Sequence, residues 1–151
     1  MRQRRLTAAF ALAMALLAVA LLPGTAYPAS PHDIAISEVA WMGTTTSSSD
    51  EWIELYNNTA SAVDLNSWTL VASGTFTITL SGNIPAGGHY LLERTDDTTV
   101  PGVAADQIYT GALNNAGEDL ILRDPASDVI DRVDASAGWF AGHADGRVPM
   151  V

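Results

Sequence analysis

The stretch Asp50-Glu51-Trp52-Ile53-Glu54-Leu55-Tyr56-Asn57 decides the fold class of this chain. It is rich in β-branched and aromatic residues and closes on Asn57, a pattern typical of a strand that runs into a turn. Similar runs flank it at residues 34–41 and 63–70. At residues 75–80 apolar side chains alternate with threonines, which predicts a half-buried antiparallel strand. A period of two therefore indicates that the chain folds from strands.

Turn signals separate these strands at close intervals. Asn114-Asn115-Ala116-Gly117 suits a short hairpin loop because its glycine can adopt a positive φ. Asp124-Pro125-Ala126-Ser127 suits a type I turn between predicted strands at residues 119–123 and 129–133. Beyond the N-terminal region, no segment has a helical apolar stripe of useful length. Some eight short strands at this spacing predict an all-β sandwich or barrel.

The alternation also selects the side chains expected in the core. A shift of one residue along a strand would turn these side chains toward solvent, so the pattern specifies the register. The predicted core comprises Ile34, Ile36, Val39, Ile53, Leu55, Leu65, Trp68, Leu70, Phe76, Ile78, Leu80, Leu91, Leu120, Leu122 and Ile130.

The N-terminus has the layout of a secretory signal peptide. Three arginines precede an unbroken run rich in leucine and alanine at residues 6–22, and a Pro-Gly pair ends that run. We expect cleavage after Ala26, which makes residues 1–26 a signal-peptide helix, 27–33 a linker and 34–151 one domain. An uncleaved leader would instead anchor the chain in a membrane. The sequence therefore predicts a protein that is secreted or held at the cell surface.

Composition narrows the classes of partner. The leader holds three of the seven basic residues and none of the 17 acidic ones, so the rest of the chain carries a net charge of −13. Such a charge repels phosphate backbones, and we expect no nucleic-acid partner. The chain has no cysteine, which excludes disulfides, so its stability must come from an ordinary core.

Six pieces of sequence occur in an order that resembles the lamin-tail domain family. They are Ile36-Ser37-Glu38-Val39, Glu51-Trp52-Ile53-Glu54-Leu55-Tyr56-Asn57, Asp64-Leu65-Asn66-Ser67-Trp68-Thr69-Leu70, Ile84-Pro85-Ala86-Gly87-Gly88-His89-Tyr90-Leu91-Leu92, Leu113-Asn114-Asn115-Ala116-Gly117-Glu118-Asp119-Leu120-Ile121-Leu122 and Val129-Ile130-Asp131. The resemblance implies an immunoglobulin-like β-sandwich, in agreement with the strand count. In bacterial exported proteins such domains look like accessory modules, and in nuclear lamins the related domain contacts proteins and chromatin. The chromatin role does not suit so acidic a chain, and the family pattern carries no catalytic motif.

Glu38 and Glu54 are the most unusual acids. Glu38 falls in phase with Ile34 and Ile36, so simple alternation aims it inward, unless a bulge turns it outward. If the two strands lie together, the carboxylates can approach one another and split their pKa values, as acid–base chemistry or glycoside cleavage requires. Alternatively, each carboxylate accepts hydrogen bonds from backbone N–H groups or from an arginine.

Calcium is a second chemical possibility. Asp96, Asp97, Asp124 and Asp128 supply hard oxygen ligands from predicted loops, although the spacing of an EF-hand is absent. Solvated carboxylates are the alternative. His32, His89 and His143 show no spacing suited to zinc, and we expect them at surfaces or turns.

Trp41, Trp52 and Tyr56 are candidates for a binding surface. Trp52 alternates with Ile53 and Leu55, and Trp41 ends the first strand, so either ring can form an exposed platform or pack in the core. Together the sequence predicts a secreted, non-catalytic module that binds a protein or a cell-surface polymer and needs no cofactor. The alternatives are a calcium-assisted hydrolase and a calcium-binding adhesion module.

Overall fold

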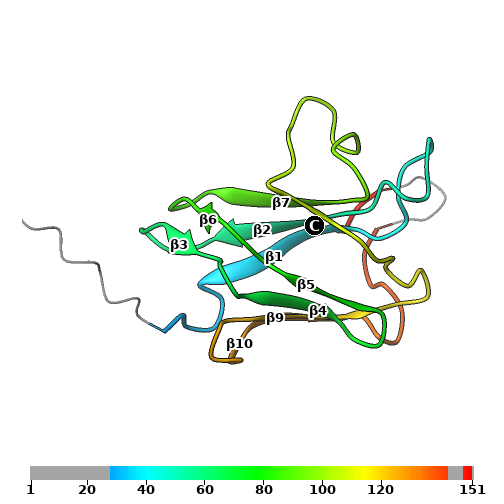
Figure 1. Ribbon diagram of the computed structural model, residues 1–151. Helices are drawn as coiled ribbons and strands as arrows, with labels where there is room; N and C mark the ends of the chain where they lie inside the picture. The colour runs from blue at the N-terminus through cyan, green and yellow to red at the C-terminus, as the bar shows by residue number, and fades with distance from the viewer. Residues whose placement is uncertain (1–27, 143–147, 151) are drawn as a thin grey trace, which may run out of the picture.

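The computed structural model describes residues 28–142 and 148–150, where it contains ten strands and no helix. Two four-stranded sheets stack in two layers, and a short strand pair lies at one end (Figure 1). Sheet I has the order β1-β2-β7-β8, sheet II has the order β10-β9-β4-β5, and the pair is β3-β6. The strands are β1 (Ile34–Ala40), β2 (Trp52–Asn57), β3 (Val63–Asp64), β4 (Thr69–Ala72), β5 (Phe76–Thr79), β6 (Asn83–Ile84), β7 (His89–Arg94), β8 (Gln107–Tyr109), β9 (Asp119–Arg123) and β10 (Val129–Asp134). The all-β sandwich is confirmed, and the predicted signal-peptide helix lies outside the described residues.

Sheet pairing is antiparallel except between β7 and β8, which run parallel. The turn at Asp124 forms as predicted: the N–H of Ser127 donates to the carbonyl of Asp124 over 2.9 Å, and β9 and β10 are hairpin partners. The turn before Gly117 differs from the prediction, because it leads from sheet I to sheet II instead of closing a hairpin. Gly117 has a φ of 130°, and a Cβ there would lie 2.2 Å from the Ala135 carbonyl oxygen, so only glycine fits.

The core between the sheets follows the predicted alternation. Of the fifteen predicted core side chains thirteen are buried, while Ile36 and Phe76 are partly buried and pack against the others. Leu91 is buried for a different reason. It pairs with Glu54, whereas its neighbours Tyr90 and Leu92 pair with the inward-facing side chains of β2. Leu91 therefore lies on the outer face of sheet I.

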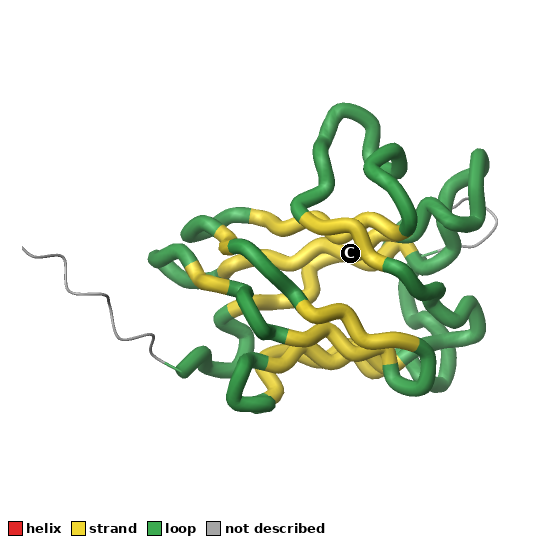
Figure 2. Tube along the Cα trace, viewed as in Figure 1, coloured by secondary structure: helices red, strands yellow, loops and turns green. Residues whose placement is uncertain are grey.

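Residues 95–106, which connect β7 to β8, rise above sheet I (Figure 2). The carboxylate of Glu93 on the outer face of β7 is fully buried, and it accepts hydrogen bonds from the backbone N–H groups of Thr99 (3.0 Å) and Val100 (2.8 Å). A buried carboxylate needs such donors, and here they also hold the connection down. One part of the outer face is thereby covered.

Residues 28–33, which we expected to be a linker, make ordered contacts with the domain. The N–H of His32 donates to the carbonyl of Ile130 over 2.7 Å. Next to it, the Asp131 carboxylate on β10 accepts a hydrogen bond from the N–H of Ile36 over 2.7 Å, which ties sheet II to β1. Within residues 28–142 and 148–150 no helix is long and apolar enough to cross a membrane.

Candidate functional site

Strand β2 presents two chemically different faces. Ile53, Leu55 and Asn57 are buried between the sheets, while Trp52, Glu54 and Tyr56 are half-buried on the outer face of sheet I. Residues two apart on a strand share a face, so Glu54 has an aromatic side chain on either side of it. Alternation predicts that one face of such a strand is buried and the other is partly exposed to solvent. The outer face of β2 fits this prediction and carries one carboxylate and two aromatic rings.

Glu38 joins this face because β1 contains a bulge. The register of β1 against β2 shifts between Ile36 and Glu38, and Ser37 is the extra residue. Glu38 is then the direct cross-strand partner of Glu54. Simple alternation, which aimed Glu38 at the core, is therefore wrong, and the bulge that was the alternative is present. The structure places both unusual acids on one face, opposite each other on neighbouring strands.

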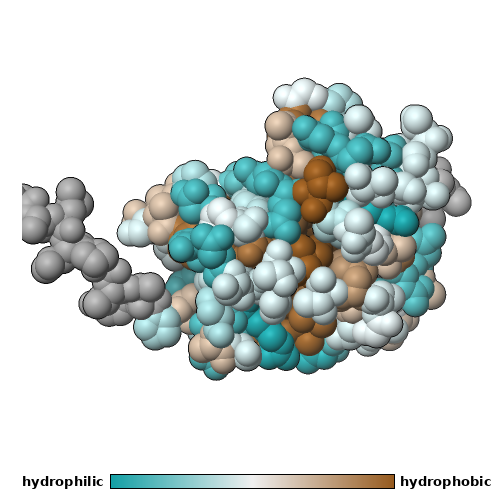
Figure 3. Space-filling view, viewed as in Figure 1, coloured by the Kyte–Doolittle hydropathy of each residue, from teal (hydrophilic) through white to brown (hydrophobic). Residues whose placement is uncertain are grey.

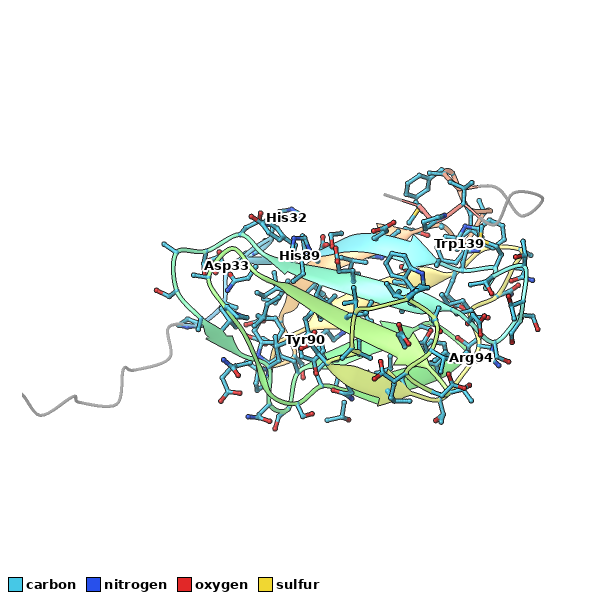
Figure 4. All side chains as sticks on the ribbon, turned by 90° about the horizontal axis from the view of Figure 1, so that it is seen from above. His32, Asp33, His89, Tyr90, Arg94 and Trp139 are labelled. Carbon is cyan, nitrogen blue, oxygen red and sulfur yellow. The ribbon has the colours of Figure 1, made fainter. Side chains whose placement is uncertain are left out.

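Ser37 and His89 bind Glu54 directly. The Ser37 hydroxyl donates to Glu54 Oε1 over 2.9 Å, and His89 Nδ1 lies 2.8 Å from the same oxygen. The rings of Tyr56 and His89 are tilted by 47° with centroids 4.9 Å apart. Figure 4 looks down on sheet I and shows His89 and Arg94 at opposite ends of β7. We call the surface formed by Glu38, Trp52, Glu54, Tyr56 and His89 the Glu54 face.

The electrostatics of the Glu54 face favour a proton or another cation. Partial burial raises the pKa of Glu38, the Glu54 carboxylate raises it further, and His89 lowers it. Like charges directly opposite each other on antiparallel strands destabilise a sheet. In the part of the chain that the structure describes, His89 is the basic side chain that contacts this pair.

The arginines that we considered as partners for these acids bind elsewhere. Arg94 lies 2.9 Å from the buried carboxylate of Glu51. Arg123 donates to the carbonyl of Ser127, and Arg132 binds Asp119 and Asp134. None of the three described arginines therefore pairs with Glu38 or Glu54, which leaves His89 as the basic side chain beside them.

Two hollows in the described structure have linings that do not include this pair of acids. The larger one, about 910 Å³, lies beside β3 between residues 28–33 and the β9–β10 turn. The smaller one, about 230 Å³, lies between β5 and β8. Figure 3 shows the side of the molecule where a narrow apolar strip runs between the two layers, flanked by polar side chains. Glu38 and Glu54 line neither hollow, so their setting is an open sheet surface.

Three of the four calcium candidates accept hydrogen bonds from their own loops, and the fourth, Asp128, is exposed. Asp97 accepts a hydrogen bond from the N–H of Ala105, and Asp96 accepts one from the hydroxyl of Thr98. Asp124 accepts hydrogen bonds from the N–H groups of Ala126 and Asp128 in the β9–β10 turn. Within residues 28–142 and 148–150 no three acidic or histidine side chains form a group that could hold a metal ion.

Trp41 is separate from the Glu54 face. Its side chain is only 7% exposed, and its ring stacks on Trp139 with centroids 5.7 Å apart and planes 4° apart. The possibility that Trp41 forms an exposed platform is therefore wrong. Trp52 and Tyr56 lie on the same outer face, as the alternation of β2 requires.

The arrangement of strands and the order of the six sequence pieces agree with a comparison against protein families. A model of the Lamin Tail Domain family matches residues 28–137. The chain belongs to the lamin tail domain family. Its sandwich is accordingly of the immunoglobulin-like type. A search of curated proteins found no match.

Sequence reasoning missed the two residues that contact the Glu54 carboxylate in this lamin tail domain. His89 was expected only as a surface or turn histidine, and Ser37 carried no expectation. Neither residue is near Glu54 in sequence, and their contact follows from the pairing of β2 with both β1 and β7. The usable signal was the spacing of three residues between Ile36 and Val39, because an extra residue in a strand shifts the alternation by one position.

Proposed function

We propose that this lamin tail domain is exported and acts as a non-catalytic binding module, with the Glu54 face as its contact surface. The observation that carries the proposal is that β2 holds Trp52, Glu54 and Tyr56 half-exposed in one row. Tyrosine and tryptophan contribute large contact areas at low entropic cost, which is why they are enriched at interfaces. An open sheet surface suits a protein or polymer partner better than a small substrate, which needs a concave site.

Export has a direct test. If the leader is removed as proposed, N-terminal sequencing of protein recovered outside the cell will begin at Tyr27. Recovery of an intact N-terminus at Met1 would contradict cleavage.

The contact surface can be tested by co-sedimentation with cell-envelope fragments of the producing organism. We expect the wild-type protein to sediment with the fragments and the Trp52→Ser/Tyr56→Ser variant to remain in solution. Phe140→Ser/Val148→Ser is the matched control, because these side chains are 71% and 49% exposed and lie outside the Glu54 face. Thermal melts must show that each variant is folded. Equal sedimentation of the wild type and the Trp52/Tyr56 variant would contradict the proposed surface.

A further inference from the structure

The Glu54 face contains two like charges opposite each other, an arrangement that a cationic partner would stabilise. Glu38 and Glu54 are direct cross-strand partners, and such like-charged pairs cost stability. None of the three described arginines pairs with these carboxylates, and the basic group that contacts Glu54 is the imidazole of His89. Local rules of this kind are most often broken at functional sites. A cation placed between the two carboxylates by a partner would relieve the repulsion.

The aromatic residues beside the pair indicate which cation fits. Trp52 and Tyr56 lie on either side of Glu54 along β2, each roughly 7 Å away by strand geometry. A guanidinium group can donate a fork of two hydrogen bonds to a carboxylate while its flat face stacks on an aromatic ring. An ammonium group is a point charge without a flat face, so it gains less from the same surroundings.

The charge of the whole domain favours the same partner. Residues 27–151 carry a net charge of −13, and such a field attracts positively charged partners and speeds their encounter. On the face itself the exposed His89 contacts Glu54 through one nitrogen only, and Glu54 Oε1 is the oxygen that it and Ser37 share. The other oxygen of Glu54 and the carboxylate of Glu38 are the acceptors that an incoming group would meet.

We propose that the Glu54 face binds an arginine side chain of a basic partner polypeptide, with the guanidinium between Glu38 and Glu54 and stacked on Trp52 or Tyr56. This inference rests on the proposed function, because it names the partner chemistry of that same surface. It assigns Glu38 and Glu54 to recognition by charge and assigns the aromatic rings to the preference for arginine over lysine.

The test measures the affinity of the exported protein for a labelled hexa-arginine peptide and for a hexa-lysine peptide by fluorescence anisotropy at low salt. We expect hexa-arginine to bind about threefold tighter or more, from stacking on the aromatic rings. Glu38→Gln/Glu54→Gln should weaken hexa-arginine binding by about tenfold, because charge-assisted hydrogen bonds are lost. Asp96→Asn/Asp128→Asn is the matched control, since it removes the same charge from two exposed sites elsewhere, and it should change the affinity less than twofold.

Three results would overturn the inference. One is equal affinity for the two peptides, and another is an equal loss in the two double variants, which would show attraction by net charge alone. A third is an unchanged preference for arginine in a folded Trp52→Leu/Tyr56→Leu variant. If any of these occurs while envelope binding still depends on Trp52 and Tyr56, the arginine inference fails and the proposed function stands. If peptide binding follows the expectation but envelope binding ignores the face, the proposed function fails instead.

Discussion

Ser37 decides where Glu38 points. As the extra residue of the β1 bulge it lets Ile36 face the core and Glu38 face outward, with only one residue between them. Its hydroxyl then binds the Glu54 carboxylate over 2.9 Å and the Glu54 carbonyl over 3.2 Å. At the scale of single residues, one extra residue in β1 therefore brings Glu38 to the Glu54 face.

The replacement Glu38→Gln should stabilise the domain at neutral pH. It removes one of two facing like charges, so we expect a gain of about 0.5 kcal/mol in the free energy of unfolding. The pKa of Glu38 is raised above 4.5 in the folded state, so the folded protein holds this proton more tightly than the unfolded chain. Stability contributed by that proton is lost as the pH rises through the raised pKa.

The higher stability of Glu38→Gln relative to the wild type should therefore be present at pH 7 and vanish below about pH 4.5. At that pH the Glu38 carboxyl group is protonated, so residue 38 is neutral in both proteins. Urea unfolding at several pH values measures this difference. Asp96→Asn is the control for a general change in net charge. A wild-type protein that is as stable as Glu38→Gln across this range would contradict the cross-strand repulsion.

At the scale of elements, a partly buried ion pair connects the residue before β2 to β7 and to the segment before β9. Arg94 Nη1 lies 2.9 Å from Glu51 Oε1, and the other carboxylate oxygen accepts a hydrogen bond from the N–H of Leu113 over 2.9 Å. Burial raises the pKa of Glu51, although the Leu113 N–H and Arg94 both lower it. The same surroundings raise the pKa of Tyr109, mainly through burial and also through Glu51.

Removing Arg94 should be costly. Arg94→Met leaves the Glu51 carboxylate buried without its cation, and we expect a loss of about 3 kcal/mol at pH 7. The loss should be smaller at pH 5, because Glu51 then takes up a proton more readily. Glu51→Gln/Arg94→Met, which removes both charges, should recover much of the stability in chemical unfolding. A double variant less stable than Arg94→Met would contradict the assigned pairing.

Glu93 fixes the connection between β7 and β8. Glu93→Ala leaves the N–H groups of Thr99 and Val100 without their acceptor. We expect hydrogen exchange of these two amides to accelerate by about tenfold, which corresponds to the loss of one hydrogen bond to a charged group. Glu54→Ala is the control, because Glu54 lies on the same sheet face but binds Ser37 and His89. Unchanged exchange at both amides in Glu93→Ala would show that the segment is held by other contacts.

At the scale of the whole molecule, the sequence predicts the sandwich and most of its core, because inward-facing side chains repeat every second residue. This alternation does not specify which strands pair when they are far apart in the sequence. The sequence therefore did not reveal the parallel pairing of β7 with β8, the outward position of Leu91, or the contact of His89 with Glu54. The sequence left two orientations for the Glu38 side chain, inward by simple alternation or outward through a bulge. Only the register of β1 against β2 decides between them.

Calcium should leave the stability of the whole domain unchanged. Asp96, Asp97 and Asp124 already accept hydrogen bonds from their own loops, and the described residues contain no group of three acidic or histidine side chains that could hold a metal ion. We expect the midpoint of thermal unfolding to shift by less than about 1 °C in millimolar calcium, because a ligand that does not bind the folded state specifically does not stabilise it. A larger rise that disappears in Asp124→Asn would contradict this expectation.

The most direct test of the account is a carbon-13 NMR titration of the glutamate side-chain carboxyl groups in the wild type and in Glu54→Gln. If the β1 bulge places Glu38 opposite Glu54, Glu38 titrates above 4.5 in the wild type, and its pKa falls toward that value in the variant. A partial fall is expected, because burial contributes more than Glu54 and is retained. A Glu38 pKa at or below 4.5, or one that does not respond to Glu54→Gln, would contradict the existence of the Glu54 face.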